Sequence, residues 1–399
     1  MRKDIFIVGL TSLFAFCSTD QGEEELLHEA NYKIVNTGTR DFYSDREVIP
    51  KPGPADAFYG QDAHYQQNQP SYTNHGDGTV TDNVTGLMWV KDMGEKVTWE
   101  NALSGVEDFT LAGCDDWRMP GIKELYSLIL FTGSISGSAE NSVRFIDTRY
   151  FIQPLGDEAA GERFIDAQTW SVTEYVGTTM RGDASVFGVN FVDGRIKGYP
   201  KFKPVSGQDN KMYVRYVRGN PEYGKNNFQE NGDETVSDLA TGLMWQQADD
   251  GIPRNWEDAL TYAENLDLAG YHDWRLPNAK EMQSIVNYSR APEVTMSAAI
   301  DPVFQVTGIT DPEGQDGQFP YFWTGTTHLD GPVPGSGAVY IAFGKAQGYM
   351  NGLLMDVHGA GAQRSDPKDG DSADYPSYWG PQGDVRYVFN YIRCVRDID

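Results

Sequence analysis

A thirteen-residue stretch occurs twice in this chain. Residues 77–89 read DGTVTDNVTGLMW, and residues 233–245 read DETVSDLATGLMW. In both copies β-forming residues, a polar turn and a second apolar run predict a β-hairpin. Because the copies are far apart in the sequence, they mark a duplicated domain rather than a short solenoid unit.

The segments that follow each hairpin recur in the same order. DWRMP at 116–120 returns as DWRLP at 273–277, and YVRYVR at 213–218 returns as YIRCVR at 391–396. Eight of the nine tryptophans fall into four pairs: 89 with 245, 99 with 256, 117 with 274, and 170 with 323. We therefore expect one domain over 71–220 and a second over 221–399. An N-terminal strand and tether over 18–70 precede them, with the strand at 31–38.

Both copies contain the same helix patterns. Apolar residues spaced three and four apart from Trp99 predict an amphipathic helix capped by Thr98, and the stripe repeats from Trp256. A second helix is predicted to begin at Asn278 with Glu281 as its capping-box partner, and its first-copy equivalent spans about 121–130. Helices early and strands late in each copy predict an α+β fold, twice.

The charge balance excludes one class of partner. The 399 residues include 32 Lys and Arg against 58 Asp and Glu, a net charge of −26. A field of this sign repels phosphate backbones, so no nucleic-acid partner is expected.

The N-terminus has the pattern of an export signal. A basic start is followed by an apolar run over 5–16 and then by Cys17. Residues 14–17 resemble a bacterial lipoprotein box, so we predict a signal peptide over 1–17 and lipidation of Cys17. The protein is then exported and held at the cell envelope, with the membrane touched only through this lipid anchor. Cleavage without lipidation is the alternative.

Two further cysteines and one acidic loop need interpretation. Cys114 and Cys394 could pair across the two domains, or remain separate free thiols.

Calcium is the one cofactor considered, because a loop offers carboxylate oxygens at Asp366, Asp369, Asp371 and Asp374. Their spacing does not match an EF-hand, and a solvated acidic loop is the simpler interpretation.

The best candidate for a ligand site is the region in which the copies differ. The second copy is longer after Trp323, and its extra loops contain Trp379, the one tryptophan without a counterpart. Aromatic rings beside polar groups suit a sugar, which offers an apolar face and hydroxyls. The predicted ligand-binding residues are Tyr375, Tyr378, Trp379, Asp384 and Tyr387. The alternative is that Trp379 covers its own domain's core.

Together these motifs resemble the C-terminal domain of the Legionella collagen-like adhesin. The WRLP block followed by a terminal R-C-x-R strand is also similar to the formylglycine-generating-enzyme branch of the C-type lectin fold. The resemblance implies two tandem C-type-lectin-like domains, each with a hairpin, two helices and a β-rich C-terminal half.

The resemblance also implies an adhesin-like binding protein rather than an enzyme. The named member of the family binds glycosaminoglycans, but a net charge of −26 favours a neutral glycan or a surface protein here. We expect a carbohydrate or glycoconjugate, with a protein-binding display module as the alternative. A modifying enzyme of the formylglycine-generating type would need a second thiol beside Cys394. The oligomeric state stays open.

Overall fold

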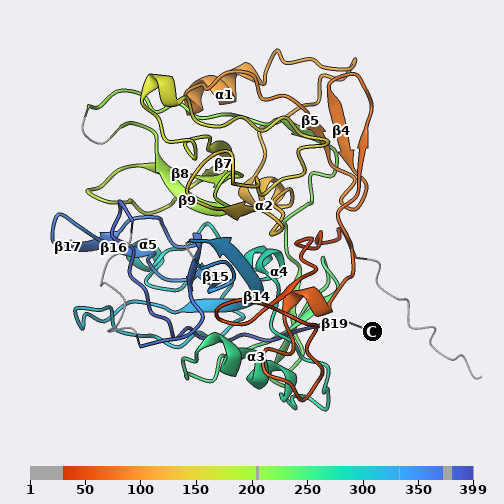
Figure 1. The fold of residues 1–399 in the computed structure, drawn as a ribbon, viewed down its shortest axis with the longest axis vertical. Helices are drawn as coiled ribbons and strands as arrows, with labels where there is room; N and C mark the ends of the chain where they lie inside the picture. The colour runs from red at the N-terminus through yellow and green to blue at the C-terminus, as the bar shows by residue number, and fades with distance from the viewer. Residues whose placement is uncertain (1–29, 204–205, 332, 372–379, 399) are drawn as a thin grey trace, which may run out of the picture.

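The computed structural model describes residues 30–203, 206–331, 333–371 and 380–398. Figure 1 shows residues 71–220, the first half, stacked on the second half, residues 221–398. The fold is mixed, with more strand than helix. No helix within these ranges is long and apolar enough to cross a membrane.

Each half contains an antiparallel four-stranded sheet built on its predicted hairpin. The hairpins pair β4 with β5 and β12 with β13, and both sheets use the strand that closes their half. The first sheet has the order β10-β5-β4-β3 and the second has the order β11-β12-β13-β19. Their strands are β3 (Tyr72–Asn74), β4 (Thr79–Asp82), β5 (Met88–Val90), β10 (Val217–Arg218), β11 (Phe228–Glu230), β12 (Thr235–Asp238), β13 (Leu243–Gln246) and β19 (Val395–Asp397).

The helices begin where their caps predict. Thr98 accepts a hydrogen bond from the Asn101 amide at the start of α1, and Asn278 with Glu281 forms a capping box on α4. The helix predicted over 121–130 is shorter in the structure, because the chain turns after α2. The helices are α1 (Trp99–Gly105), α2 (Ile122–Tyr126), α3 (Trp256–Glu264), α4 (Ala279–Ser284) and α5 (Pro292–Thr295), with short 3-10 turns η1 (Asp62–His64) and η2 (Glu158–Ala160).

A seven-stranded sheet crosses from one half to the other. Its order is β6-β14-β15-β18-β9-β8-β7, and β18 of the second half joins β9 of the first through Gln363 opposite Ile196. Its strands are β6 (Ser134–Ile135), β7 (Thr169–Glu174), β8 (Ser185–Asn190), β9 (Arg195–Pro200), β14 (Tyr321–Asp330), β15 (Gly337–Ala342) and β18 (Gln363–Pro367). A separate hairpin, β16 (Gln347–Met350) with β17 (Leu353–Asp356), extends from the second half.

The strand register identifies equivalent positions in the two halves. Trp170 lies opposite Gly188, which lies opposite Lys197. In the second half Trp323 lies opposite Tyr340, which lies opposite Arg364. Lys197 therefore corresponds to Arg364 and, two residues further along the strands, Tyr199 corresponds to Asp366.

Tryptophans and arginines at equivalent positions of the two halves make the same structural contacts. The indole N–H of Trp99 donates to Ser171 O at 2.9 Å, and that of Trp256 donates to Thr324 O at 2.8 Å. The buried guanidinium groups at the start of the closing strands also bind backbone carbonyls: Arg215 binds Val90 O and Lys91 O, and Arg393 binds Gln246 O and Gln247 O. Because these contacts satisfy buried groups in both halves, the repeated motifs are structural.

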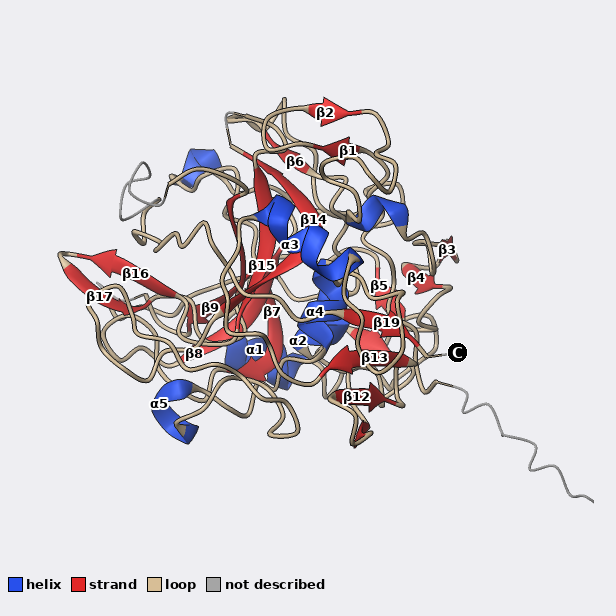
Figure 2. Cartoon of the chain, turned by 90° about the horizontal axis from the view of Figure 1, so that it is seen from below, coloured by secondary structure: helices blue, strands red, loops and turns tan. Residues whose placement is uncertain are grey.

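The halves meet at α2 and α4, which lie side by side (Figure 2). Lys123 on α2 donates to Ser284 O at 2.6 Å, and Lys280 on α4 donates to Ser127 O at 2.8 Å. The two lysines occupy equivalent positions of the repeat, and so do the two serines. The contact is therefore reciprocal, as across a two-fold axis.

Residues 30–70 pack against the rest of the molecule. Asp62 is buried and accepts hydrogen bonds from Thr37 and from Thr326 of the second half, both at 2.6 Å. The prediction of a strand over 31–38 is wrong, because the backbone amides there bind scattered partners rather than one neighbouring strand. The strands of the N-terminal region lie further along the chain, where β1 (Phe42–Tyr43) pairs with β2 (Val48–Ile49). Cys17 and the predicted signal peptide lie outside the described residues.

Candidate functional site

Two large cavities are associated with the β9 strand. The first, here called the first-half pocket, has a volume of about 960 Å³ and is almost entirely lined by the first half. The second, the junction pocket, has a volume of about 690 Å³ and takes residues from both halves. Because Arg195, Lys197 and Tyr199 alternate onto one face of β9, the same strand face supplies Arg195 to the junction pocket and Tyr199 to the first-half pocket.

Polar side chains dominate the first-half pocket. They come from β9, from Lys96 before α1, from residues 161–168 and from Lys203 with residues 207–212, and the second half adds one glutamine. The side chains are Lys96, Glu162, Arg163, Asp166, Gln168, Tyr199, Lys203, Gln208, Asp209, Asn210, Lys211, Met212 and Gln382.

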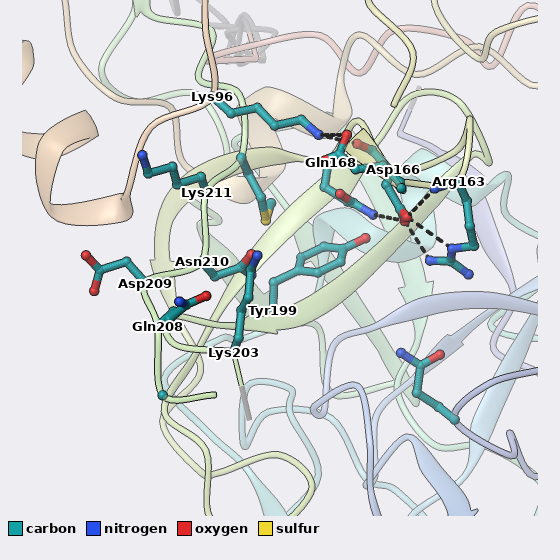
Figure 3. A pocket seen from close by; sticks show the side chains of 15 residues that line it. Lys96, Arg163, Asp166, Gln168, Tyr199, Lys203, Gln208, Asp209, Asn210 and Lys211 are labelled. Atoms are coloured by element: carbon teal, nitrogen blue, oxygen red, sulfur yellow. Dashed lines mark hydrogen bonds and ion pairs between the residues drawn. The ribbon is translucent and has the colours of Figure 1, made fainter. Parts of the chain in front are cut away.

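One wall of this pocket is fixed by hydrogen bonds around Asp166 (Figure 3). The Arg163 guanidinium binds both carboxylate oxygens, at 2.6 and 3.1 Å, and the Gln168 amide donates to the same carboxylate at 3.2 Å. Burial opposes ionisation of Asp166, but its bonds to Arg163 outweigh that effect and lower its pKa. Lys96 donates to Glu162 at 2.5 Å and to Asp166 O at 2.6 Å. Hydrogen bonds within the protein therefore fix the side chains of this wall.

The opposite wall follows β9 and consists of Lys203 with residues 207–212. The Lys203 amide donates to Gln208 O at 2.7 Å, and the Asn210 side chain donates to Pro200 O at 3.0 Å. Tyr199 lies between the two walls in Figure 3. Its ring packs on the apolar cluster of the first half and stays partly exposed. Burial raises the pKa of its hydroxyl well above the ordinary value, so the hydroxyl remains a donor at neutral pH.

The charge of this pocket differs from that of the whole chain. Its lining has four cationic side chains, Lys96, Arg163, Lys203 and Lys211, against three carboxylates, Glu162, Asp166 and Asp209. The pocket is thus close to neutral, although the chain carries −26. A neutral polar ligand can approach it without repulsion.

The equivalent position in the second half is a buried carboxylate at the wall of the junction pocket. Asp366, the counterpart of Tyr199, is buried and accepts hydrogen bonds from Asn390 Nδ2 at 3.1 Å and Tyr387 N at 3.2 Å. Burial raises the pKa of Asp366 to about 6, and these bonds limit the rise. Asp366 therefore serves the fold, which corrects its assignment as a calcium ligand.

The other predicted ligand-site residues are separated. Tyr387 packs edge-on against Tyr321, with ring centres 4.9 Å apart, so it belongs to the core rather than to an open binding surface. Asp384 binds His358 Nε2 at 2.7 Å and forms an ion pair with Arg364, which places it in the junction pocket. Tyr375, Tyr378, Trp379 and Asp374 lie outside the described residues.

No metal cluster forms from the acidic loop within the described part of the chain. Asp369 and Asp371 are both exposed there, whereas Asp366 is buried. Within that part, no three His, Cys, Asp or Glu side chains are grouped closely enough to hold a metal ion.

Of the two alternatives that the sequence left open for Cys114 and Cys394, the structure has the second, because both thiols are free. Cys114 packs at the edge of the apolar cluster of the first half, and Cys394 is buried in that of the second. Burial raises the pKa of the Cys394 thiol, so it is a structural group rather than a reactive one. Within the described residues, no second cysteine accompanies Cys394 in that cluster.

The first-half pocket was missed in the sequence, although a signal for it exists. Residues 195–211 contain Arg195, Lys197, Lys201, Lys203 and Lys211 with one acid, Asp209, in a strongly acidic chain. A local excess of cations in an acidic chain indicates a surface whose charge differs from that of the rest of the protein, and it could have pointed to this pocket.

Comparisons with known proteins identify a family. Residues 78–218 and 234–354 each match the model of the Lcl C-terminal domain. No curated protein and no solved structure matches the chain. Because the two matches cover more than half of its length, the chain belongs to the Lcl C-terminal domain family and carries two tandem copies of that domain.

Proposed function

We propose that this protein is a non-catalytic binding protein of the cell envelope that recognises a neutral carbohydrate in the first-half pocket. The observation that carries the proposal is Tyr199, whose partly exposed ring lies between two polar walls. Membership of the Lcl family, whose named protein is an adhesin, supports a surface-associated role. Export and anchoring through Cys17, and the lectin-like character of both domains, are parts of this proposal.

The chemistry of the pocket suits sugar hydroxyls. Gln168, Gln208, Asn210 and Gln382 offer amide donors and acceptors, and Tyr199 offers an aromatic ring. A sugar can stack its apolar face on such a ring while its hydroxyls bind planar amides. A polyanionic glycan fits less well, because the small positive excess of the pocket is surrounded by a chain of −26.

The difference between the halves also supports this location. The first-half pocket is lined by the aromatic ring of Tyr199, whereas the junction pocket is lined at the equivalent position by Asp366, which has no ring on which a sugar could stack. A duplicated domain needs only one copy to bind ligand, and the other can then become structural. We therefore place carbohydrate binding in the first half rather than in the second-half loops.

Binding of the full chain to a glycan array, followed by titration of the best neutral glycan, tests this function. Tyr199→Ala should weaken affinity at least about tenfold, because stacking and a hydroxyl donor are both lost. Asn210→Ala should weaken it less, since one amide is removed. Tyr349→Ala is the matched control, because Tyr349 is a partly exposed strand tyrosine outside the pocket.

Two results would contradict the proposal. A glycan that binds all three variants with the affinity of the unchanged chain would place its site elsewhere. An array without any specific ligand would instead favour a surface protein as the partner.

A further inference from the structure

A third cavity lies beside α2, where the two halves meet. This cavity, here called the α2 pocket, has a volume of about 400 Å³, which is in the range of pockets that hold ligands. Its two lysines are balanced by two carboxylates, so its lining carries no net charge. It is lined by residues 121–124, Thr173, residues 223–226, Phe228, residues 285–288 and Asp301.

The repeat gives the α2 pocket a counterpart across the two-fold axis that relates the halves. Lys123 of the pocket corresponds to Lys280, because each follows its DWR motif at the same distance. Tyr288 of the pocket corresponds to Phe131 by the same count. The two places can therefore be compared residue by residue.

Two further positions of the pocket have counterparts. Gly224 and Asn68 each lie four residues before the first strand of their sheet, β11 and β3, and their φ angles are positive, 83° and 50°. Thr173 and Thr326 each accept a hydrogen bond at 3.0 Å from the amide of the first residue of the neighbouring helix. Backbone and side chains are thus arranged alike in both places.

In the counterpart, a segment of the N-terminal region occupies the space. Asn36 N donates to Asn68 O at 2.9 Å, and Asn36 O accepts from Lys280 Nζ at 3.1 Å. Thr37 O accepts from Phe131 N at 2.9 Å. The cavity that remains beside this segment has a volume of only about 60 Å³.

The matching groups of the α2 pocket are unused. Gly224 O and Tyr288 N have no hydrogen-bond partner within the described residues. The Lys123 ammonium uses two of its three donors within the protein. No residue of 30–70 lines this pocket. The groups that hold a segment in one place are therefore available beside an open cavity in the other.

Burial shows the same difference between the two places. Phe131 and Thr326 are buried, whereas Tyr288 and Thr173 are partly exposed. Equivalent positions of a duplicated domain differ in this way when one of them is covered and the other is not. The α2 pocket therefore lacks the cover that its counterpart has.

The segment in the counterpart indicates what the α2 pocket can hold. Residues 36–38 read Asn-Thr-Gly, and Gly38 has a φ of 79°, a conformation that favours glycine. The segment is held through backbone groups, so its side chains can be small. An uncharged segment also suits a pocket whose lining has no net charge.

We propose that the α2 pocket is a second ligand site, which binds a short polypeptide segment of a partner protein, with small uncharged residues and a glycine. Gly224 O, Tyr288 N and Lys123 Nζ hold the backbone of this segment, as their counterparts hold residues 36–37. The site is separate from the first-half pocket, and its ligand does not depend on the proposed carbohydrate.

The probe is the capped hexapeptide IVNTGT, the sequence of residues 34–39, because it contains the segment held in the counterpart and carries no charge. Isothermal titration of the full chain should give one site with a dissociation constant of ~0.1 mM. N-methylation of the peptide at its asparagine should weaken binding at least about tenfold, because it removes the N–H that Gly224 O accepts. The scrambled peptide TGNVTI should not bind.

A variant that copies the counterpart locates the site. Asn287 of the α2 pocket corresponds to Leu130, whose Cδ2 lies 3.5 Å from the position of a Cβ on Gly38. Asn287→Leu should therefore tighten hexapeptide binding about threefold, because it adds apolar contact. This gain cannot arise from a loss of folding.

Asn74→Leu is the matched control for this variant. Asn74 and Asn287 each accept a hydrogen bond at 3.0 Å from the amide two residues later, and Asn74 lies outside the pocket. Asn74→Leu should leave the affinity for the hexapeptide unchanged.

Three results would overturn the proposal. Absence of hexapeptide binding at millimolar concentration would show that the pocket holds no such segment. Equal affinities of the hexapeptide and its N-methylated form would show that Gly224 O does not hold the backbone. An affinity that Asn287→Leu does not alter would place the peptide elsewhere. Tyr199→Ala lies outside the α2 pocket and should bind the hexapeptide normally, so failure of the carbohydrate proposal would not affect these results.

Discussion

At the residue scale, Asp356 is a buried acid that connects the halves. One oxygen accepts a hydrogen bond from Tyr175 OH of the first half at 2.7 Å, and the other accepts from Gly359 N at 2.8 Å. A third donor, His358 N, lies at 3.3 Å. Burial nevertheless raises the pKa of Asp356 to about 7, because neutral donors do not replace the lost hydration of the carboxylate. The folded protein therefore favours the protonated form of Asp356 over the carboxylate.

The raised pKa of Asp356 predicts a pH dependence of stability. Its folded pKa lies above the unfolded value of about 3.9, so its stabilising contribution is complete below pH 4 and is lost as pH rises towards 7. The free energy of unfolding, relative to Asp356→Asn, should fall by up to ~1.4 kcal/mol per pH unit between pH 5 and 7 and then become constant. Urea unfolding of both proteins at each pH measures this difference. A difference that does not vary with pH would contradict it.

At the element scale, α2 and α4 are equivalent helices of the two halves that differ in their N-cap residue. Asn278 caps α4 with its side chain, whereas α2 begins at Gly121, which has no side chain to cap with. Glu124 and Glu281 complete both helix starts by accepting from the Gly121 and Asn278 amides at 2.8 Å. The φ of Gly121 is −66°, and a Cβ there would meet Glu124 Oε2 at 3.5 Å, which is ordinary contact.

Transferring the cap to the first half should therefore stabilise it. Gly121→Asn is expected to raise the free energy of unfolding by about 0.5 kcal/mol, since it adds a cap hydrogen bond and restricts the unfolded chain. The reverse change, Asn278→Gly, should cost a few tenths of a kcal/mol. Chemical denaturation of the two variants checks both signs. A loss of stability in Gly121→Asn would show that the neighbouring Thr173 and Gly224 surface cannot accept the longer side chain.

The elements show how far local patterns predict this fold. The hairpins, the Thr98 and Asn278 caps and the closing strands are set by neighbouring residues, so the sequence predicted them correctly. The join of β9 to β18 depends on the docking of residues that are distant in sequence, and no periodicity encodes it. The first-half pocket was missed for the same reason, because its lining comes from segments that are far apart in the sequence, from Lys96 to Gln382.

At the scale of the whole molecule, the net charge of −26 opposes compactness. Many of the described ion pairs involve exposed side chains, such as Lys225 with Glu222 and Arg149 with Asp147, and pairs of this kind contribute little to stability. Sodium chloride should therefore stabilise the protein by screening self-repulsion. Raising it from 10 to 300 mM should increase the melting temperature by a few degrees, measured by circular dichroism at constant pH. A decrease would show that attractive pairs outweigh the repulsion.

The reciprocal lysines of α2 and α4 have a consequence for the origin of this chain. Because Lys123 and Lys280 each find their acceptor on the other copy, two identical subunits placed about a two-fold axis would satisfy the same two contacts. Ile196 and Gln363, also equivalent, meet on a similar axis in the central sheet. The two halves thus pack against each other as the subunits of a two-fold dimer would, within one polypeptide. Fusion fixes a one-to-one ratio of the subunits and lets each specialise, which an assembly of identical chains cannot do.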